Sequence, residues 1–294
     1  MISSLPTGIV DTHVHSAPDY LPRKMGDLEV VRAAADAGYR AVVLKSHHVV
    51  TADRAQVAQE LVSELQVFGG AALNLHATGG INPYGVETVL RLGGRVIWLP
   101  TFTSANQVAW TRRGGQGSSN LNALGQVDSG VKILDAHGEV LPDVVTVLRQ
   151  IADAGATLAT GHIGATEIMK VVPLARHLGV ANVIVTHPEL SCVSLPIDQQ
   201  VELAELGGVW FERVYVITVP GSQGYPLPQI AEAVRTVGID TTIMASDFGQ
   251  ANNPPPVEGM AQYIHDMRAL GFSQDELEAM TCVQPAAALG LGPA

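Results

Sequence analysis

The segment Ile9-Val10-Asp11-Thr12-His13-Val14-His15 is a β-branched run that ends in two histidines spaced by one residue. Side chains two residues apart on a strand point to the same side, so both imidazoles can reach one cation if that side faces a cavity. A His-x-His pair taken alone is more often two ordinary histidines than a pair of metal ligands. The interpretation therefore depends on matching groups at the ends of other strands.

Short apolar runs alternate with longer Ala-, Leu- and Glu-rich stretches of helical spacing, as expected of repeated βα units. Eight strands are predicted, at Ile9–His15, Ala41–His47, Ala71–His76, Arg95–Thr101, Thr157–His162, Asn182–His187, Gly208–Arg213 and Thr241–Asp247. Helices are predicted between them, at Leu28–Ala37, Ala52–Phe68, Gly85–Leu92, Pro142–Ala154, Glu167–Leu178, Asp198–Leu206, Pro228–Val237 and Val257–Leu270. Glycine directly follows most of these helices, where a left-handed residue lets the chain turn.

This order of elements predicts the α/β class and a (β/α)8 barrel of the TIM type, a fold compatible with 294 residues. No linker or shift in composition divides the chain, so we expect one barrel domain over residues 1–294 with an additional C-terminal helix. An open, doubly wound sheet would also alternate strands and helices. Such a sheet usually carries a glycine-rich phosphate turn after its first strand, whereas residues 13–18 read His-Val-His-Ser-Ala-Pro.

The composition, with 47% hydrophobic and 15% charged residues, is typical of a globular protein with a large core. A formal net charge of −11 argues against a nucleic-acid partner, because phosphate binding needs clustered Lys and Arg. We expect a small-molecule substrate and no membrane partner.

The first residues lack the pattern of a signal peptide, which predicts a cytoplasmic protein with reduced Cys192 and Cys282. Ala-rich outer helices could pack against a second copy, giving a homo-oligomer.

Candidate metal ligands follow several of the predicted strands. His13 and His15 end the first strand, His162 the fifth, His187 the sixth and Asp247 the eighth. The C-terminal strand ends of a closed barrel form one ring, so these four imidazoles and one carboxylate would converge. Nitrogen and carboxylate oxygen donors suit Zn²⁺ best, and also Mn²⁺, Fe²⁺, Co²⁺ or Ni²⁺.

The order of these groups resembles the amidohydrolase superfamily of metal-dependent hydrolases, over nearly the whole chain. The segment Gln284-Pro285-Ala286-Ala287-Ala288-Leu289-Gly290 also looks like the closing helix of that superfamily. The resemblance implies that His13, His15, His162 and Asp247 bind a metal ion and that Asp247 acts as general base. It implies that His187 binds a second metal ion or orients the substrate and the attacking water.

The chain departs from the binuclear members of the superfamily at the fourth strand. Those members usually carry a bridging carboxylated lysine or glutamate there, whereas residues 97–101 read Ile-Trp-Leu-Pro-Thr. Lys45, at the end of the second strand, could supply a carbamate from an adjacent position, but we favour a role in binding an anionic group. One metal ion is therefore favoured over two.

Other polar residues near the strand ends are predicted to line the substrate pocket. They are Lys45, His47, His76, Glu212 and Arg213. Lys45 and Arg213 would contact a carboxylate, while Glu212 could orient a donor or protonate a leaving group. Two irregular runs, residues 111–120 and 249–256, would lie above the barrel mouth, and the first is a lid candidate.

The leading hypothesis is a metal-dependent hydrolase that uses a metal-activated water on a small polar or anionic amide, cyclic amide, lactone or ester. A metal-dependent lyase of the same superfamily, either a decarboxylase or a hydratase, is the alternative. A noncatalytic metal-binding barrel is disfavoured, because a structural site is normally closed by protein ligands. A nuclease of this fold is disfavoured by the acidic net charge.

Overall fold

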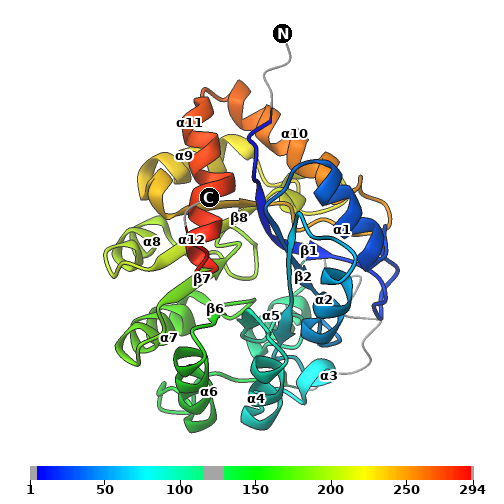
Figure 1. Cartoon of the computed structure of the whole chain (residues 1–294). Coiled ribbons are helices and arrows are strands. Elements are labelled where there is room, and N and C mark those ends of the chain that lie inside the picture. Colours follow the sequence, from blue (N-terminus) through cyan, green and yellow to red (C-terminus); the bar gives the residue numbers. More distant parts are fainter. Residues whose placement is uncertain (1–4, 116–128, 293–294) are drawn as a thin grey trace.

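A computed structural model describes residues 5–115 and 129–292 as parallel strands that alternate with helices (Figure 1). The strands are β1 (Val10–His15), β2 (Ala41–Lys45), β3 (Gln66–Phe68), β4 (Gly70–Ala72), β5 (Val96–Trp98), β6 (Thr157–Ala159), β7 (Asn182–Thr186), β8 (Val209–Val214) and β9 (Thr242–Ala245). The helices are α1 (Asp27–Asp36), α2 (Ala52–Gln59), α3 (Leu75–Thr78), α4 (Pro83–Arg91), α5 (Ala105–Arg112), α6 (Pro142–Asp153), α7 (Ala165–His177), α8 (Ile197–Ala204), α9 (Leu227–Val237), α10 (Pro256–Ala269), α11 (Gln274–Glu278) and α12 (Gln284–Ala288). Short 3₁₀ turns, η2 (Tyr215–Thr218) and η3 (Ile239–Thr241), and a π-helical turn, η4 (Ala279–Val283), complete the chain.

The strands pair in chain order, β1-β2-β3 and β4-β5-β6-β7-β8-β9, and every pairing is parallel. Only Gly69 separates β3 from β4, so the two segments occupy one barrel position. Beyond β9 the chain returns to β1, where Asp247 N–H donates to the His13 carbonyl (2.9 Å) and His15 N–H to the Phe248 carbonyl (2.8 Å). The predicted (β/α)8 barrel is confirmed.

The break at Gly69 reflects crowding of the backbone around this barrel position. A Cβ at Gly69 would collide with the carbonyl of Thr51, and one at Gly70 with the carbonyl of Val96. Both positions therefore need glycine, since no side chain can fit between the adjoining backbone segments.

The prediction for the third barrel position was wrong. Helix α2 ends at Gln59, not at Phe68, and the strand lies at residues 66–72 instead of 71–76. The Gln59 side chain ends the helix: it donates to the carbonyls of Val62 and Leu65 and accepts from Val67 N–H, supplying partners that a further helical turn would otherwise provide.

The C-terminal helix α12 lies over the barrel interior in Figure 1, at the end where the strands begin. Thr157, the first residue of β6, donates its hydroxyl to the Ala288 carbonyl (2.7 Å). The additional C-terminal helix is thereby confirmed, and it covers the end opposite the strand termini that carry the histidines. None of the helices in residues 5–115 and 129–292 has the length and apolar character needed to cross a bilayer.

Half of the predicted lid at residues 111–120 lies outside the described residues, which stop at 115 and resume at 129. The preceding connection holds a helix that was not predicted, α5, which begins after Ser104. The second irregular run, residues 249–256, follows β9 and reaches the barrel mouth, where Gln250 and Asn253 line a pocket.

Candidate metal centre

Three of the predicted ligands meet at the barrel mouth. His13 and His15 come from β1, and Asp247 follows β9, the strand next to β1. Their donor atoms all lie within 4.8 Å of one another. The Nε2 atoms of His13 and His15 lie 3.2 and 3.1 Å from Asp247 Oδ1. Residues more than 230 positions apart thus form the donor set expected of a divalent metal site.

Hydrogen bonds on the far side of each ring hold these two histidines. Nδ1 of His13 donates to Glu212 Oε2 (2.9 Å), whose other oxygen accepts from the Thr12 hydroxyl (2.5 Å). Nδ1 of His15 donates to the Lys45 carbonyl (3.0 Å). Both rings therefore turn an unprotonated Nε2 toward Asp247, the orientation that metal-binding histidines need.

His162 and His187 complete the group from β6 and β7. The ring centroid of His187 lies 4.8 Å from that of His162 and 5.9 Å from that of His13. Nδ1 of His162 donates to Gln107 Oε1 (2.9 Å). Nδ1 of His187 is buried and has no hydrogen-bond partner among the described residues. A buried orphan nitrogen of this kind calls for a partner, and a bound group in the centre could supply it.

Electrostatics keep these imidazoles neutral. Burial lowers the pKa of each one well below the usual value, in His13, His15, His47, His162 and His187. Neutral imidazole is the form that binds metal ions, so the centre needs no deprotonation before it binds a cation. The same burial lowers the pKa of Lys45 to about 8 and raises that of Glu212 to about 7.

Backbone strain is concentrated at two of the candidate residues. His187 has φ of +30° and Asp247 has φ of +51°, a region that residues other than glycine rarely adopt. Such conformations persist only where the surrounding structure imposes them, and they occur preferentially at functional sites. His187 is the first residue after β7 and Asp247 the second after β9, and both line the pocket.

A pocket of about 360 Å³ opens above these groups. Its walls include His15, His47, His162, His187 and Asp247. Phe102 stacks on His47 with ring centroids 3.8 Å apart, which forms a flat aromatic wall. Arg23, from the connection after β1, supplies a cation and is paired with Asp19 (2.8 Å). The pocket thus combines the metal-type donors with a planar wall and a positive charge.

Three more predicted pocket residues lie at or beneath this pocket. His47 lines it, and the hydroxyl of Thr101 hydrogen-bonds to Nδ1 of its ring (2.8 Å). Lys45 and Glu212 lie below, fully buried: Lys45 Nζ donates to His13 Nε2 (2.8 Å), and Glu212 contacts Nδ1 of the same ring. These two residues contact the candidate ligands and do not line the pocket.

Two predicted substrate contacts, Arg213 and His76, lie elsewhere. Alternation along β8 turns Glu212 inward and Arg213 outward, where it pairs with Glu189 and donates to Gln200 Oε1 (3.0 Å). The assignment of Arg213 to the pocket was therefore wrong. His76 was also misplaced, because the strand ends at Ala72 and the residue lies exposed on α3.

Three residues that the sequence interpretation missed contribute to the site. Gln107 holds His162, while Phe102 and Arg23 line the pocket. A signal for Gln107 was present: Ser104-x-x-Gln107 matches the start of a helix, and the Ser104 hydroxyl accepts from Gln107 N–H (3.0 Å). Phe102 and Arg23 carry no comparable local signal.

A family model described as "Family of unknown function (DUF6282)" matches residues 8–212, a span that includes every candidate ligand except Asp247. The chain belongs to this family. A search of curated protein sequences finds no match.

Solved structures of similar fold cover almost the whole chain. An amidohydrolase from Pseudomonas aeruginosa aligns with a TM-score of 0.61 at 10% identity, over 96% of this chain and 95% of that one. A dihydroorotase aligns with a TM-score of 0.60 at 13% identity, over 98% and 83%. A 2,6-dihydroxybenzoate decarboxylase, complexed with 2,6-dihydroxybenzoate, aligns with a TM-score of 0.57 at 10% identity, over 97% and 100%. The predicted resemblance to the amidohydrolase superfamily is confirmed at the level of the fold.

Proposed function

We propose that this protein is a metal-dependent hydrolase that acts on a small, anionic amide, cyclic amide, lactone or ester. The observation that carries the proposal is the convergence of His13, His15 and Asp247 within 4.8 Å, on the wall of an open pocket. A structural metal site is normally closed by protein ligands, whereas a catalytic site leaves a position open to water or substrate.

The residues present fit a divalent cation. His13, His15 and Asp247 would hold it, with His162 as a fourth ligand and His187 beside it, and the orphaned Nδ1 of His187 is consistent with a bound group. Zinc suits this mixture of imidazole and carboxylate donors. When bound, such an ion lowers the pKa of a coordinated water to about 7 and polarises the carbonyl under attack.

Asp247 is the best-placed general base. Its Oδ1 lies 3.2 and 3.1 Å from the unprotonated Nε2 atoms of His13 and His15, and the residue is 9% exposed and lines the pocket. It can therefore accept the proton of the attacking water and pass it to the leaving group, provided that both lie within hydrogen-bond distance. His187, which lies next to His162 and lines the same pocket, would orient the substrate carbonyl.

The pocket walls favour a planar, negatively charged substrate. Phe102 and His47 offer a stacked aromatic surface, and Arg23 lies at the pocket wall as a cation for a carboxylate. Lys45 is buried beneath His13 and cannot contact a substrate directly. We propose that its charge influences the binding of an anionic group only through the metal centre. Location in the cytoplasm, assembly as a homo-oligomer and a single domain over residues 1–294 stay predictions from the sequence.

A metal-dependent lyase is the second candidate, favoured by the similarity to 2,6-dihydroxybenzoate decarboxylase over that protein's full length. One experiment separates the two functions. The zinc-loaded protein is incubated with two panels of compounds. The first contains cyclic amides and lactones, and the second contains hydroxylated aromatic carboxylates. Products are identified by mass spectrometry. Ring opening with a gain of water supports the hydrolase. Loss of carbon dioxide from the carboxylates, without ring opening in the first panel, would replace it with the lyase.

A further inference from the structure

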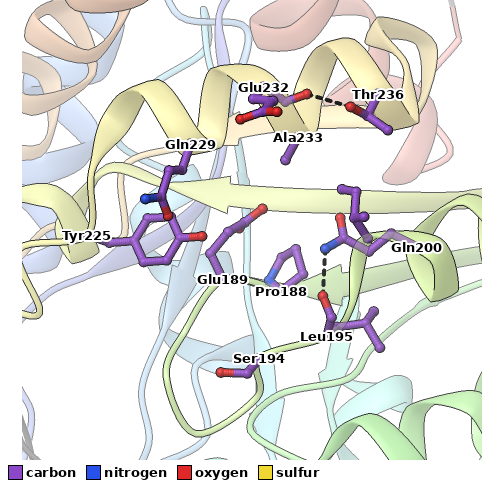
Figure 2. A pocket seen from close by; sticks show the side chains of 11 residues that line it. Pro188, Glu189, Ser194, Leu195, Gln200, Tyr225, Gln229, Glu232, Ala233 and Thr236 are labelled. Carbon is purple, nitrogen blue, oxygen red and sulfur yellow. Dashed lines mark hydrogen bonds between the residues drawn. The ribbon is translucent and has the colours of Figure 1, made fainter.

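A second cavity, of about 430 Å³, lies away from the candidate metal centre, between α8, α9 and the turn after β7 (Figure 2). It is lined by Glu189, Leu195, Gln200, Tyr225, Gln229 and Ala233, among others. No residue of this lining also lines the pocket above the histidines. Its size is that of a small-molecule site.

Glu189 is the unusual residue of this cavity, and Figure 2 shows its carboxylate among the lining side chains. The residue is 7% exposed. One carboxylate oxygen pairs with Arg213, while the other, Oε2, is buried and accepts no hydrogen bond from any described residue. An unpaired buried carboxylate oxygen costs free energy, and a ligand that donates a hydrogen bond would remove that cost.

The charges around the cavity select the sign of the ligand. The described residues that line it include two glutamates, Glu189 and Glu232, and neither lysine nor arginine. Arg213, behind the lining, offsets the charge of Glu189, so the exposed Glu232 leaves the cavity with a net negative charge. A cation is therefore attracted and an anion repelled.

The remaining lining fits a cation on an apolar stem. Tyr225 and Gln229 line the cavity together with Glu189, and both side chains carry oxygen atoms that can accept hydrogen bonds. Leu195 and Ala233 add apolar surface. Gln200 is already committed, because it donates to the Leu195 carbonyl (2.9 Å) and accepts from Arg213.

We propose that this cavity is a second ligand site, which binds a small organic amine in its ammonium form with Glu189 Oε2 as the anionic contact. The ammonium group donates to Glu189, Tyr225 and Gln229, and its hydrocarbon stem lies against Leu195 and Ala233. The site is independent of the proposed hydrolase function, since the two pockets share no lining residue.

Calorimetric titration with benzylamine and hexylamine tests the proposal, with benzyl alcohol and hexanol as neutral probes of the same shape. The full chain is used, together with the His13→Ala/His15→Ala variant, which excludes coordination of the amine at the metal centre. Ala233→Leu fills the cavity without touching the Glu189–Arg213 pair. Glu202→Gln, an exposed position on α8 outside the lining, is the matched control for Glu232→Gln.

The amines are expected to bind with one-to-one stoichiometry, in wild type and in the double histidine variant alike. Ala233→Leu should weaken binding at least about tenfold, the loss expected when a charge-assisted hydrogen bond is prevented. Glu232→Gln should weaken it less, and Glu202→Gln should leave it unchanged. Equal binding of the alcohols, undiminished binding to a folded Ala233→Leu protein, or no amine binding up to about 10 mM would overturn the proposal.

Discussion

Asp247 joins the two parts of the proposed chemistry, because its carboxylate contacts both histidines of β1 and also lines the pocket. Asp247→Asn keeps the shape of the residue, and Asn tolerates the left-handed backbone that this position requires. We expect turnover to fall by roughly 10² to 10⁴-fold, the usual worth of a general base. Steady-state kinetics beside the exposed control Asp240→Asn measures this effect, and equal turnover in both variants would remove Asp247 from the role of base.

Lys45 decides between one metal ion and two. Its Nζ donates to His13 Nε2, the atom that would bind a cation, and burial lowers its pKa to about 8. If Lys45 does not bridge two ions, Lys45→Met retains about one equivalent of metal per chain, the same as wild type. Elemental mass spectrometry of both proteins checks this expectation. A drop from about two equivalents to one or fewer would identify a carboxylated bridge instead.

The sequence allowed the candidate ligands to be predicted, because each of them is the polar residue that ends an apolar run. Fewer of the residues that line the pocket could be predicted from the sequence. Glu212 and Arg213 are neighbours on β8, so only one of them can face the barrel interior, and the choice depends on a register that appears in the fold alone. Arg23 and Phe102 lie on connections whose paths follow from long-range packing.

Among the elements, α5 matters because it carries Gln107 to His162. The Gln107 side chain accepts from Nδ1 of His162 and from the Cys192 thiol (3.0 Å). Gln107→Leu keeps the bulk but removes the acceptor, so the ring of His162 loses its fixed orientation. We expect metal affinity to fall about 10- to 100-fold, as for other partners of metal-binding histidines. Competition with a fluorescent chelator measures the affinity; no change relative to the exposed control Gln262→Leu would show that α5 does not support the centre.

The third barrel position depends on two adjacent glycines. A Cβ at Gly70 would collide with the Val96 carbonyl, so Gly70→Ala should lower the free energy of unfolding by about 3 kcal/mol or more. Gly85, on α4, has room for a methyl group, and Gly85→Ala should raise stability by about 0.5 to 1 kcal/mol. Urea denaturation of both variants tests this contrast in sign. Equal stability of Gly70→Ala and wild type would contradict the explanation that backbone crowding interrupts the strand between β3 and β4.

This part of the barrel also shows where sequence patterns fail. The run from Ala52 onward continues with helical spacing into the strand, and neither the end of α2 nor the glycine break has a periodic signature. The Gln59 side chain ends the helix through partners that are fixed only once the chain has turned. Elsewhere the alternation of strand and helix is strong enough to predict which elements exist and in what order. The predicted ends of these elements differ from the observed ends by a few residues.

At the scale of the whole molecule, five of the buried histidines, His13, His15, His47, His162 and His187, make stability depend on pH. Their pKa values are lowered in the folded state, so between about pH 6.5 and 5 the unfolded chain gains protons that the folded chain does not. Three carboxyl groups act in the opposite direction, because the pKa values of Asp11, Glu167 and Glu212 are raised. The histidines outnumber them, and stability should fall on acidification.

The metal-free protein, prepared with a chelator, is the sample for this prediction. Each uncompensated proton changes the free energy of unfolding by about 1.4 kcal/mol per pH unit. Urea midpoints at several pH values between 5 and 6.5 should decrease steadily toward the acidic end. A midpoint that rises on acidification would mean that the raised carboxyl groups outweigh the imidazoles.

Metal content tests the central claim most directly, because everything proposed for the barrel mouth depends on a bound cation. Wild type and the His13→Ala/His15→Ala variant are purified, reconstituted with zinc, dialysed and measured by elemental mass spectrometry, with circular dichroism as the check on folding. We predict about one equivalent of zinc in wild type and almost none in the folded variant. Equal metal content in the two proteins, or none in wild type, would contradict the metal centre and leave the barrel without the proposed chemistry.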